Sequence, residues 1–230
     1  MENQEPNTVP PSQKSSAVPP FEAGLVIIVT FLLSIVLGLI FWLTVGTGPT
    51  LVIGELMILI IPLSYLLLKR IDIKSFVGID LKPKFIVLGA ALGIALLFLN
   101  IVVSGILYSI FGVSQAVEES NLLLTGLSNS TLGLIAVIAS LALAGVCEEF
   151  AFRGFLQNAL TRRYSFIPAV IISSVVFGLF HFDPQLVYIL SAAISGVAFG
   201  YIYHRWNYVT SATAHSTMNL IVLALLLLGL

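Results

Sequence analysis

The chain has 230 residues, of which 58% are hydrophobic and only 9% are charged. A soluble domain carries about 25% charged residues, so this composition, with a mean hydropathy of +1.08, indicates a polytopic membrane protein. The net charge of −1 gives no reason to expect a nucleic-acid partner, and the single cysteine, Cys147, excludes an intramolecular disulfide.

The first 20 residues differ in composition from the rest of the chain. They hold five of the ten prolines, interspersed with Ser, Gln, Asn and Thr, and such a segment cannot bury a core. We therefore expect a disordered, cytoplasmic tail over 1–20 and a single transmembrane helical domain over 21–230. The tail lacks the basic region of a signal peptide, so the first apolar run is expected to be a retained helix.

Seven apolar runs are long enough to be transmembrane helices, which need roughly 17–25 residues. They predict an all-α polytopic transmembrane helix bundle of about seven spans, within a range of six to eight. The runs are Leu25–Val45, Leu51–Leu68, Phe85–Phe111, Leu132–Cys147 (continuing as helix towards Ala159), Phe166–Phe182, Leu186–Tyr203 and Val209–Leu228.

The basic residues predict the orientation of this bundle. With seven spans, three connections that carry Lys or Arg fall on one side together with Lys14, whereas connections 46–50, 112–131 and 183–185 carry none. Cytoplasmic connections hold an excess of Lys and Arg, so we expect a cytoplasmic N-terminus in the plasma membrane. The residues concerned are Lys69, Arg70, Lys74, Lys82, Lys84, Arg162, Arg163 and Arg205.

Ionisable residues inside membrane segments are costly and mark function by default. Glu149 and Arg153 lie one helical turn apart and are expected to pair. Glu148 points about 100° away and lacks that partner, which makes it our candidate for a general base near neutral pH. Alternatively, the helix reaches the cytoplasmic interface here and these charges are solvated.

Two further pairs have the same i, i+4 spacing: Phe177 with His181, and His215 with Asn219. Neutral histidine and asparagine can donate hydrogen bonds to a developing oxyanion, although each can equally serve to join helices. Together with the acids they favour a hydrolytic site in a cavity between the fourth, fifth and seventh helices, opening toward the cytoplasm. The reaction expected is peptide-bond hydrolysis by activated water.

The three patterns Glu-Glu-x-x-x-Arg (148–153), Phe-x-x-x-His (177–181) and His-x-x-x-Asn (215–219) resemble the motifs of the CPBP family. This family comprises type II CAAX prenyl endopeptidases and the bacteriocin-processing or immunity proteins called Abi, and the likeness covers about 125–225. The resemblance implies an intramembrane glutamate-type endopeptidase acting on a membrane-associated peptide, prenylated or not. It implies that Glu148 activates water with His181 nearby, that His215 and Asn219 are oxyanion donors, and that Glu149, Arg153 and Phe177 are supporting residues.

Other functions are weighed against this interpretation. Glu148, Glu149, His181 and His215 include the residue types that bind zinc, but no His-Glu-x-x-His is present and we expect neither metal nor cofactor. A non-catalytic bacteriocin self-immunity or scaffold protein remains the alternative class, and a transporter is weaker still.

For three further residues in or beside the spans, we expect structural positions rather than catalytic roles. Cys147 is expected to be a small buried residue, Asn100 to bond a neighbouring helix, and Glu55 to face the far interface rather than line a pathway.

The depths of Glu148 and His181 do not match on this interpretation. Glu148 lies about 24 Å along its helix from Leu132, near the cytoplasmic side, whereas His181 lies about 15 residues beyond Phe166, nearer the far side. Helix tilt, a deep start of the fifth helix, or an interfacial 150–165 segment would each bring them together, and the sequence leaves all three open.

Overall fold

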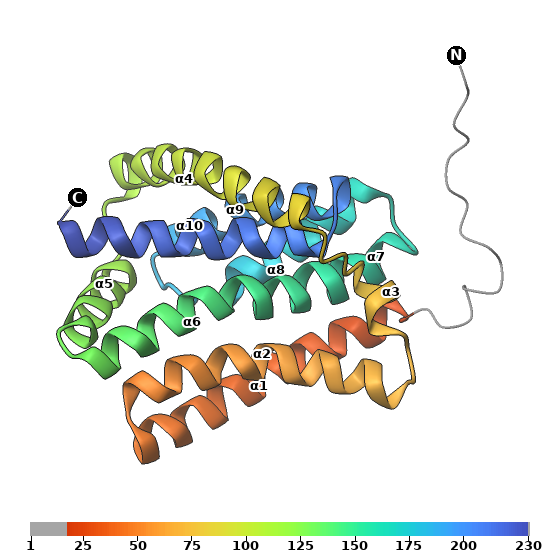
Figure 1. Ribbon diagram of the computed structural model, residues 1–230, viewed down its shortest axis with the longest axis horizontal. Coiled ribbons are helices and arrows are strands. Elements are labelled where there is room, and N and C mark those ends of the chain that lie inside the picture. Colours follow the sequence, from red (N-terminus) through yellow and green to blue (C-terminus); the bar gives the residue numbers. More distant parts are fainter. Residues whose placement is uncertain (1–17, 230) are drawn as a thin grey trace.

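The computed structural model describes residues 18–229, which form a bundle of long helices aligned roughly along one axis (Figure 1). Short helices join or extend the long ones, and the described residues contain no β-strand. The elements are α1 (Pro20–Val45), α2 (Thr47–Leu68), α3 (Ile73–Val77), α4 (Pro83–Phe111), α5 (Gln115–Ser128), α6 (Thr131–Glu149), the π-helical η2 (Phe150–Gln157), α7 (Asn158–Thr161), α8 (Phe166–Phe180), α9 (Val187–Arg205) and α10 (Tyr208–Leu228).

The membrane-spanning elements agree with the seven predicted apolar runs. Six helices are long and apolar enough to cross a membrane, and α8 is a shorter apolar helix. The prediction of an all-α integral membrane bundle is thus confirmed. Of the predicted tail, residues 1–17 lie outside the described residues; Val18 is buried, and α1 begins at Pro20.

The helix that carries the two acids continues well beyond them. Residues Thr131–Thr161 form one helical span of 31 residues, in which η2 is a stretch of wider π-helical turns. Every residue of η2 is buried among the other helices, so this part of the 150–165 segment is not an exposed helix on the surface of the bundle. Glu148 is therefore about 20 Å from the Thr161 end of this span, counted at 1.5 Å per residue.

Helix α8 ends at Phe180 rather than at the predicted Phe182, and His181, directly after the helix, is partly buried. The 15 residues of α8 carry His181 about 22 Å from the start of the helix, which matches the depth of Glu148. The turn that follows is stabilised by Asp183, whose carboxylate accepts hydrogen bonds from the backbone N–H groups of Gln185 (3.0 Å) and Tyr188 (2.8 Å). The mismatch in depth expected from the sequence is thereby removed.

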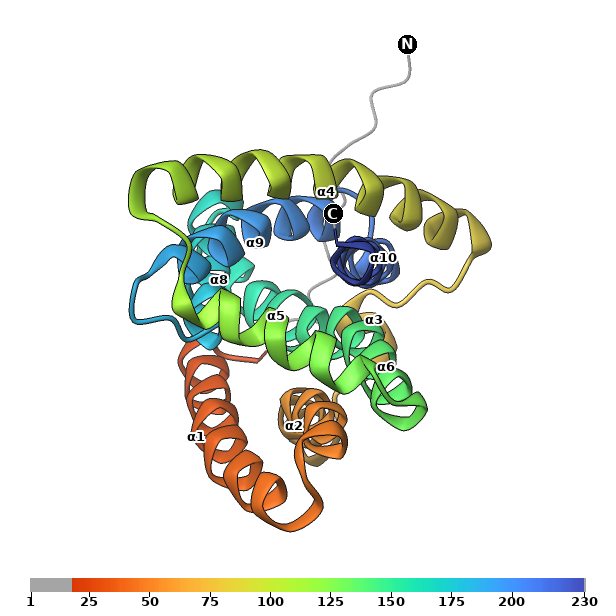
Figure 2. The ribbon, with the colours of Figure 1, turned by 90° about the vertical axis from the view of Figure 1, so that its left-hand side faces the viewer.

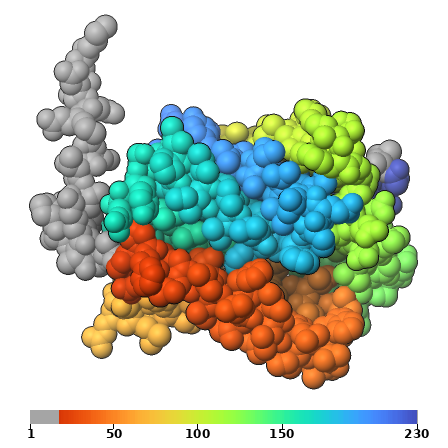
Figure 3. Space-filling model, turned by 180° about the vertical axis from the view of Figure 1, so that it is seen from behind, coloured from red at the N-terminus to blue at the C-terminus, as the bar shows by residue number. Residues whose placement is uncertain are grey.

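The connection 112–131 is not only a loop, because it contains helix α5. This helix joins the end of α4 to the start of α6 and lies across one end of the bundle (Figure 2). Ser114 caps its N-terminus by accepting a hydrogen bond from Ala116 N, and no residue of α5 is buried. In the view from behind, a recess lies between α1 and the chain around the α8–α9 turn (Figure 3).

Helix α10 packs between α4 and α6 at backbone contact distance, and glycines make this approach feasible. A Cβ atom on Gly93 of α4 would lie 2.5 Å from Ala214 O, and one on Gly145 of α6 would lie 2.3 Å from Ser216 Oγ. Since His215 stands between Ala214 and Ser216, these two contacts fix its position relative to the acids of α6.

We predict that Gly145→Ala destabilises the protein by about 1–3 kcal/mol, because the added methyl group overpacks the α6–α10 crossing. The control is Gly38→Ala on α1, where a Cβ atom meets nothing within 4 Å. Thermal unfolding of both variants in detergent tests this. If Gly145→Ala melts at the temperature of Gly38→Ala, the close packing described here is incorrect.

Candidate active site

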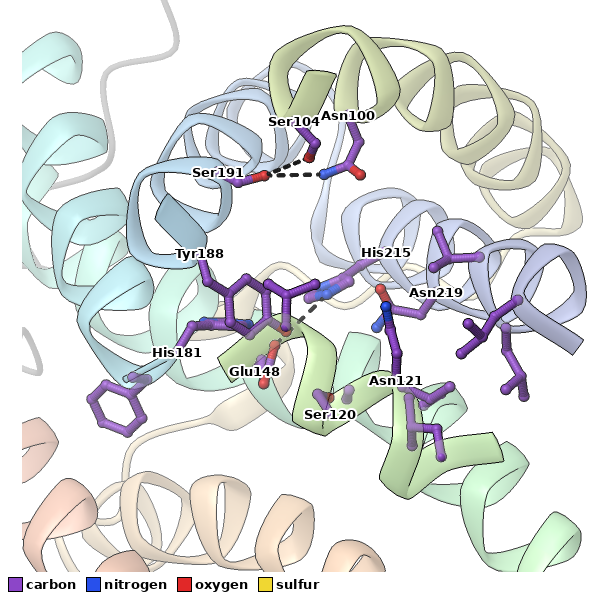
Figure 4. A pocket seen from close by; sticks show the side chains of 18 of the residues that line it. Asn100, Ser104, Ser120, Asn121, Glu148, His181, Tyr188, Ser191, His215 and Asn219 are labelled. Atoms are coloured by element: carbon purple, nitrogen blue, oxygen red, sulfur yellow. Dashed lines mark hydrogen bonds and ion pairs between the residues drawn. The ribbon is translucent and has the colours of Figure 1, made fainter. Parts of the chain in front are cut away.

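A cavity of about 530 Å³ lies inside the bundle and collects all four predicted catalytic residues (Figure 4). Its walls come from α2, α4, α5, α6, the α8–α9 turn, α9 and α10. The lining contains no Lys or Arg. Its polar members are Glu55, Asn100, Ser104, Tyr108, Ser120, Asn121, Glu148, His181, Tyr188, Ser191, His215 and Asn219.

The pair predicted from spacing, Glu149 with Arg153, is present and completely buried. Arg153 Nη1 lies 2.9 Å from Glu149 Oε1, and the side chains are 1% and 0% exposed. This contact is an ion pair without the geometry of a hydrogen bond, since Nη1 has no hydrogen-bond partner among the described residues. Nη2 donates to Gly196 O of α9 at 3.0 Å, and the guanidinium carbon lies 4.3 Å from the ring centroid of Phe177.

A second side chain of η2 repeats the contact of Arg153 with α9. Gln157 Nε2 donates to Gly200 O at 3.0 Å, one turn beyond the Arg153–Gly196 contact. A Cβ atom on Gly200 would lie 2.6 Å from Gln157 Oε1, and one on Gly196 would lie 3.1 Å from Arg153 Nη2. Glycine at both positions lets two polar side chains reach the backbone of α9, which anchors η2 inside the bundle.

The remaining acceptor capacity of Glu149 is used by α10. Ser211 Oγ donates to Glu149 Oε2 at 2.5 Å, and His215 Nδ1 lies 3.2 Å from Glu149 Oε1. The His215 ring also stacks on Phe199, with centroids 4.4 Å apart. Ser211 was not among the predicted site residues, although it lies four residues before His215 and therefore on the same helix face.

Glu148 differs from its neighbour in that it has no close partner. Its side chain faces the cavity, and its nearest charged or titratable contact is His215 Nε2, 3.7 Å from Oε2 (Figure 4). No hydrogen bond to this carboxyl group is formed within residues 18–229. The two adjacent acids thus occupy different environments, one bound on both oxygens and one directed into the cavity.

His181 lies beside the same cavity, held by its own helix. Its Nδ1 is 3.0 Å from Phe177 O, and because a carbonyl only accepts, Nδ1 carries the hydrogen in this contact. Nε2 of the neutral ring is then left with a free lone pair. Phe177, predicted as a supporting residue, packs edge-on against the rings of His181 and His215 as well as beneath Arg153.

Glu55 is the functional candidate that sequence reasoning placed wrongly. It was expected to face the far interface, but it lines the cavity together with Glu148, and its Oε2 is buried without a hydrogen-bond partner among the described residues. A lone carboxylate in an apolar span was the signal that could have identified it. Asn100 does bond a neighbouring helix as predicted, since its amide lies 3.4 Å from Ser195 Oγ, and Cys147 is buried as predicted.

The cavity lies toward the end of the bundle that is opposite the basic connections. Its outer lining comes from Tyr108, Asn121, Phe182 and Leu226, near the end of α4, α5, the α8–α9 turn and the end of α10. The two expectations of cytoplasmic basic connections and a cavity opening to the cytoplasm are therefore incompatible. The cytoplasmic opening was expected because the depth of Glu148 was counted from Leu132, without the 12 helical residues that follow Glu149.

The donor groups in the described part of the chain do not form a recognisable metal site. No group of three or more His, Cys, Asp or Glu side chains in this part is arranged to hold an ion. Glu149 is already engaged by Arg153, Ser211 and His215. These residues do not fit a zinc centre, and independence from metal stays a prediction.

Comparisons with known proteins agree with the resemblance drawn from the three motifs. The family model described as type II CAAX prenyl endopeptidase Rce1-like matches residues 129–221, which include all three motifs. The curated protein named "Putative membrane peptidase YdiL" from Bacillus subtilis is 30% identical over 127 residues, which is 55% of this chain and 50% of that protein. The chain thus spans about half the length of this curated relative. No solved structure matches the chain.

We predict that Arg153→Ala lowers the free energy of unfolding by about 3–5 kcal/mol, because it leaves the Glu149 carboxylate buried without its counter-charge. Arg163→Ala is the control, since Arg163 is exposed and outside the cluster. Thermal and denaturant unfolding in detergent measure the difference. Equal stability of the two variants would contradict the ion pair.

For Glu55→Leu we expect the opposite sign. The substitution removes a buried acceptor without a partner, whose burial costs about 1–3 kcal/mol, so the melting temperature should stay equal or rise. Glu118→Leu, at an exposed position of α5, is the control and should not change it. A marked fall in the melting temperature of Glu55→Leu would show that Glu55 has a structural partner.

Proposed function

We propose that the chain is a membrane endopeptidase in which Glu148 activates water for the hydrolysis of a peptide bond. The observation that carries this proposal is that two adjacent carboxylates, Glu148 and Glu149, have different contacts. Both carboxylate oxygens of Glu149 are in contact with Arg153, Ser211 or His215, whereas Glu148 faces a cavity large enough for a peptide segment. A carboxylate kept free in a membrane interior is costly, and such groups mark functional sites.

The chemistry assigned to Glu148 is general base and then general acid catalysis. The carboxylate takes a proton from water as the water oxygen attacks the carbonyl carbon of the substrate, which gives a tetrahedral oxyanion. The same proton passes to the leaving nitrogen as the C–N bond breaks, so that one water and one peptide bond yield a carboxylic acid and an amine. His181 Nε2, free because Nδ1 donates to Phe177 O, accepts a hydrogen bond from the water and orients it.

Stabilisation of the oxyanion is assigned to His215 and Asn219. Asn219 lies one turn beyond His215 and faces the same cavity (Figure 4), and its amide donates without any change of charge. His215 Nδ1 is directed at Glu149, so Nε2 donates only when both ring nitrogens carry hydrogen. Glu149 stabilises that charged form of the ring and fixes its orientation.

A non-catalytic immunity or scaffold protein is the alternative. Such a protein would use these polar groups to join helices, as Asn100 and Ser104 join α4 to α9. Glu148 makes no comparable link, and within residues 18–229 its only charged or titratable contact is the 3.7 Å approach of His215. This difference favours the enzyme.

We predict that Glu148→Gln lowers peptidase activity by about 100-fold to 10,000-fold, the range that general base catalysis contributes. The melting temperature should be unchanged, because the substituted group has no close partner. Glu119→Gln, at an exposed position of α5, is the control and should retain full activity. Activity is measured in proteoliposomes on a library of internally quenched peptides; near-normal turnover by Glu148→Gln would refute the assignment of the base.

Activity should also survive removal of divalent metal ions. After dialysis against a strong chelator we expect unchanged turnover, and elemental analysis should give well under one zinc per chain, because the mechanism uses a carboxylate, water and neutral or charged donors. Loss of activity on chelation and its recovery on addition of zinc would instead assign Glu148, His181 and His215 as ligands.

A further inference from the structure

We infer that the catalytic cavity opens on the extracytoplasmic side of the membrane, and that its substrate is a polar peptide segment exposed on that side. The inference rests on the proposed peptidase function for the identity of the substrate, but not for the direction of access. It combines two observations: the end of the bundle at which the basic residues lie, and the end at which the cavity reaches the surface.

The basic residues of the described chain lie almost entirely at one end of the bundle. Eight of them lie in the connections α2–α4, α7–α8 and α9–α10 or at the helix ends that border them, and the ninth is the buried Arg153. At the opposite end, the connections α1–α2, α4–α6 and α8–α9 contain neither Lys nor Arg, and hold Glu118, Glu119 and Asp183 instead. Excess Lys and Arg in short connections marks the cytoplasmic side, so the basic end is assigned to the cytoplasm.

The cavity is closed toward this basic end. Between Glu148 and the basic connections lies η2, whose side chains Phe150, Phe152 and Phe155 are all at most 3% exposed. The rings of Tyr65 and Phe76 pack against Phe155 and extend this packed layer of side chains. A peptide approaching from the cytoplasm, including one held there by a lipid anchor, meets this packed layer rather than Glu148.

Toward the other end the cavity continues to the surface. A second cavity of about 520 Å³ shares Ser120 and Phe182 with the first and is bounded by α5 and the α8–α9 turn. Asn121 is exposed and Phe182 is 74% exposed at this mouth. In the end-on view α5 lies across the interior of the helix bundle at this side (Figure 2).

The lining favours a peptide over a hydrocarbon chain. Burying the amide groups of Asn121 and Asn219 against a prenyl group would leave them without partners, whereas a peptide backbone supplies donors and acceptors. With Glu55 and Glu148 in the lining and no basic side chain, the cavity suits a neutral or cationic segment. The substrate class is therefore a polar segment of an exported or membrane protein.

Cysteine labelling in a Cys147→Ala background tests the direction of access. Asn121→Cys marks the mouth, Lys74→Cys marks the basic end, and Leu39→Cys on the exposed apolar surface of α1 is the unreactive control. With a membrane-impermeant charged maleimide, we expect Asn121→Cys to react in intact cells and Lys74→Cys to react only in inverted vesicles. The reverse pattern, or no labelling of Asn121→Cys from outside, would overturn the inference.

The same labelling is repeated with Glu148→Gln, which should leave it unchanged because access does not depend on catalysis. Failure of the peptidase assignment and failure of the access assignment are thus separate results. The substrate class is tested by comparing peptide termini in wild-type and Glu148→Gln cells. Cleavage sites lost in the variant should lie in extracytoplasmic segments; sites confined to cytoplasmic tails would refute the inference.

Discussion

The buried ion pair between Glu149 and Arg153 is the constraint on which the rest of this structure depends. Two charges removed from water are stable only when further contacts satisfy them, since their mutual attraction need not exceed the cost of desolvation. Here α10 supplies Ser211 and His215 to the carboxylate, and α9 supplies Gly196 O to the guanidinium. One pair on one helix thereby determines where two other helices must lie.

The same pair explains why the adjacent acids Glu148 and Glu149 have different environments. The helical rotation that directs Glu149 to Arg153 turns Glu148 toward the cavity, where His181 and His215 approach from other helices. The π-helical turns of η2 begin directly after the acids, and such turns occur frequently at functional sites. Continuation of this helix as a buried segment separates the Glu148 carboxylate from the basic end of the bundle.

The parts of the site that could be predicted from the sequence are those set by local spacing. The i, i+4 relation of Glu149 and Arg153 depends on one helix alone, and the same relation would have revealed Ser211 beside His215. The depth of Glu148 could not be predicted in this way, because an apolar sequence after two acids fits an interfacial helix as well as a buried π-helix. Glu55 was misplaced because its position depends on how α2 packs against α6, which only the tertiary structure shows.

The central claim, that the Glu149–Arg153 pair organises the site and leaves Glu148 free, is tested most directly by a double-mutant cycle. The unfolding free energies of Glu149→Gln, Arg153→Met and the double variant are compared with wild type. We expect each single variant to lose more stability than the double variant, because each leaves one buried charge uncompensated while the double removes both. Additive losses, with the double variant the least stable, would contradict this account.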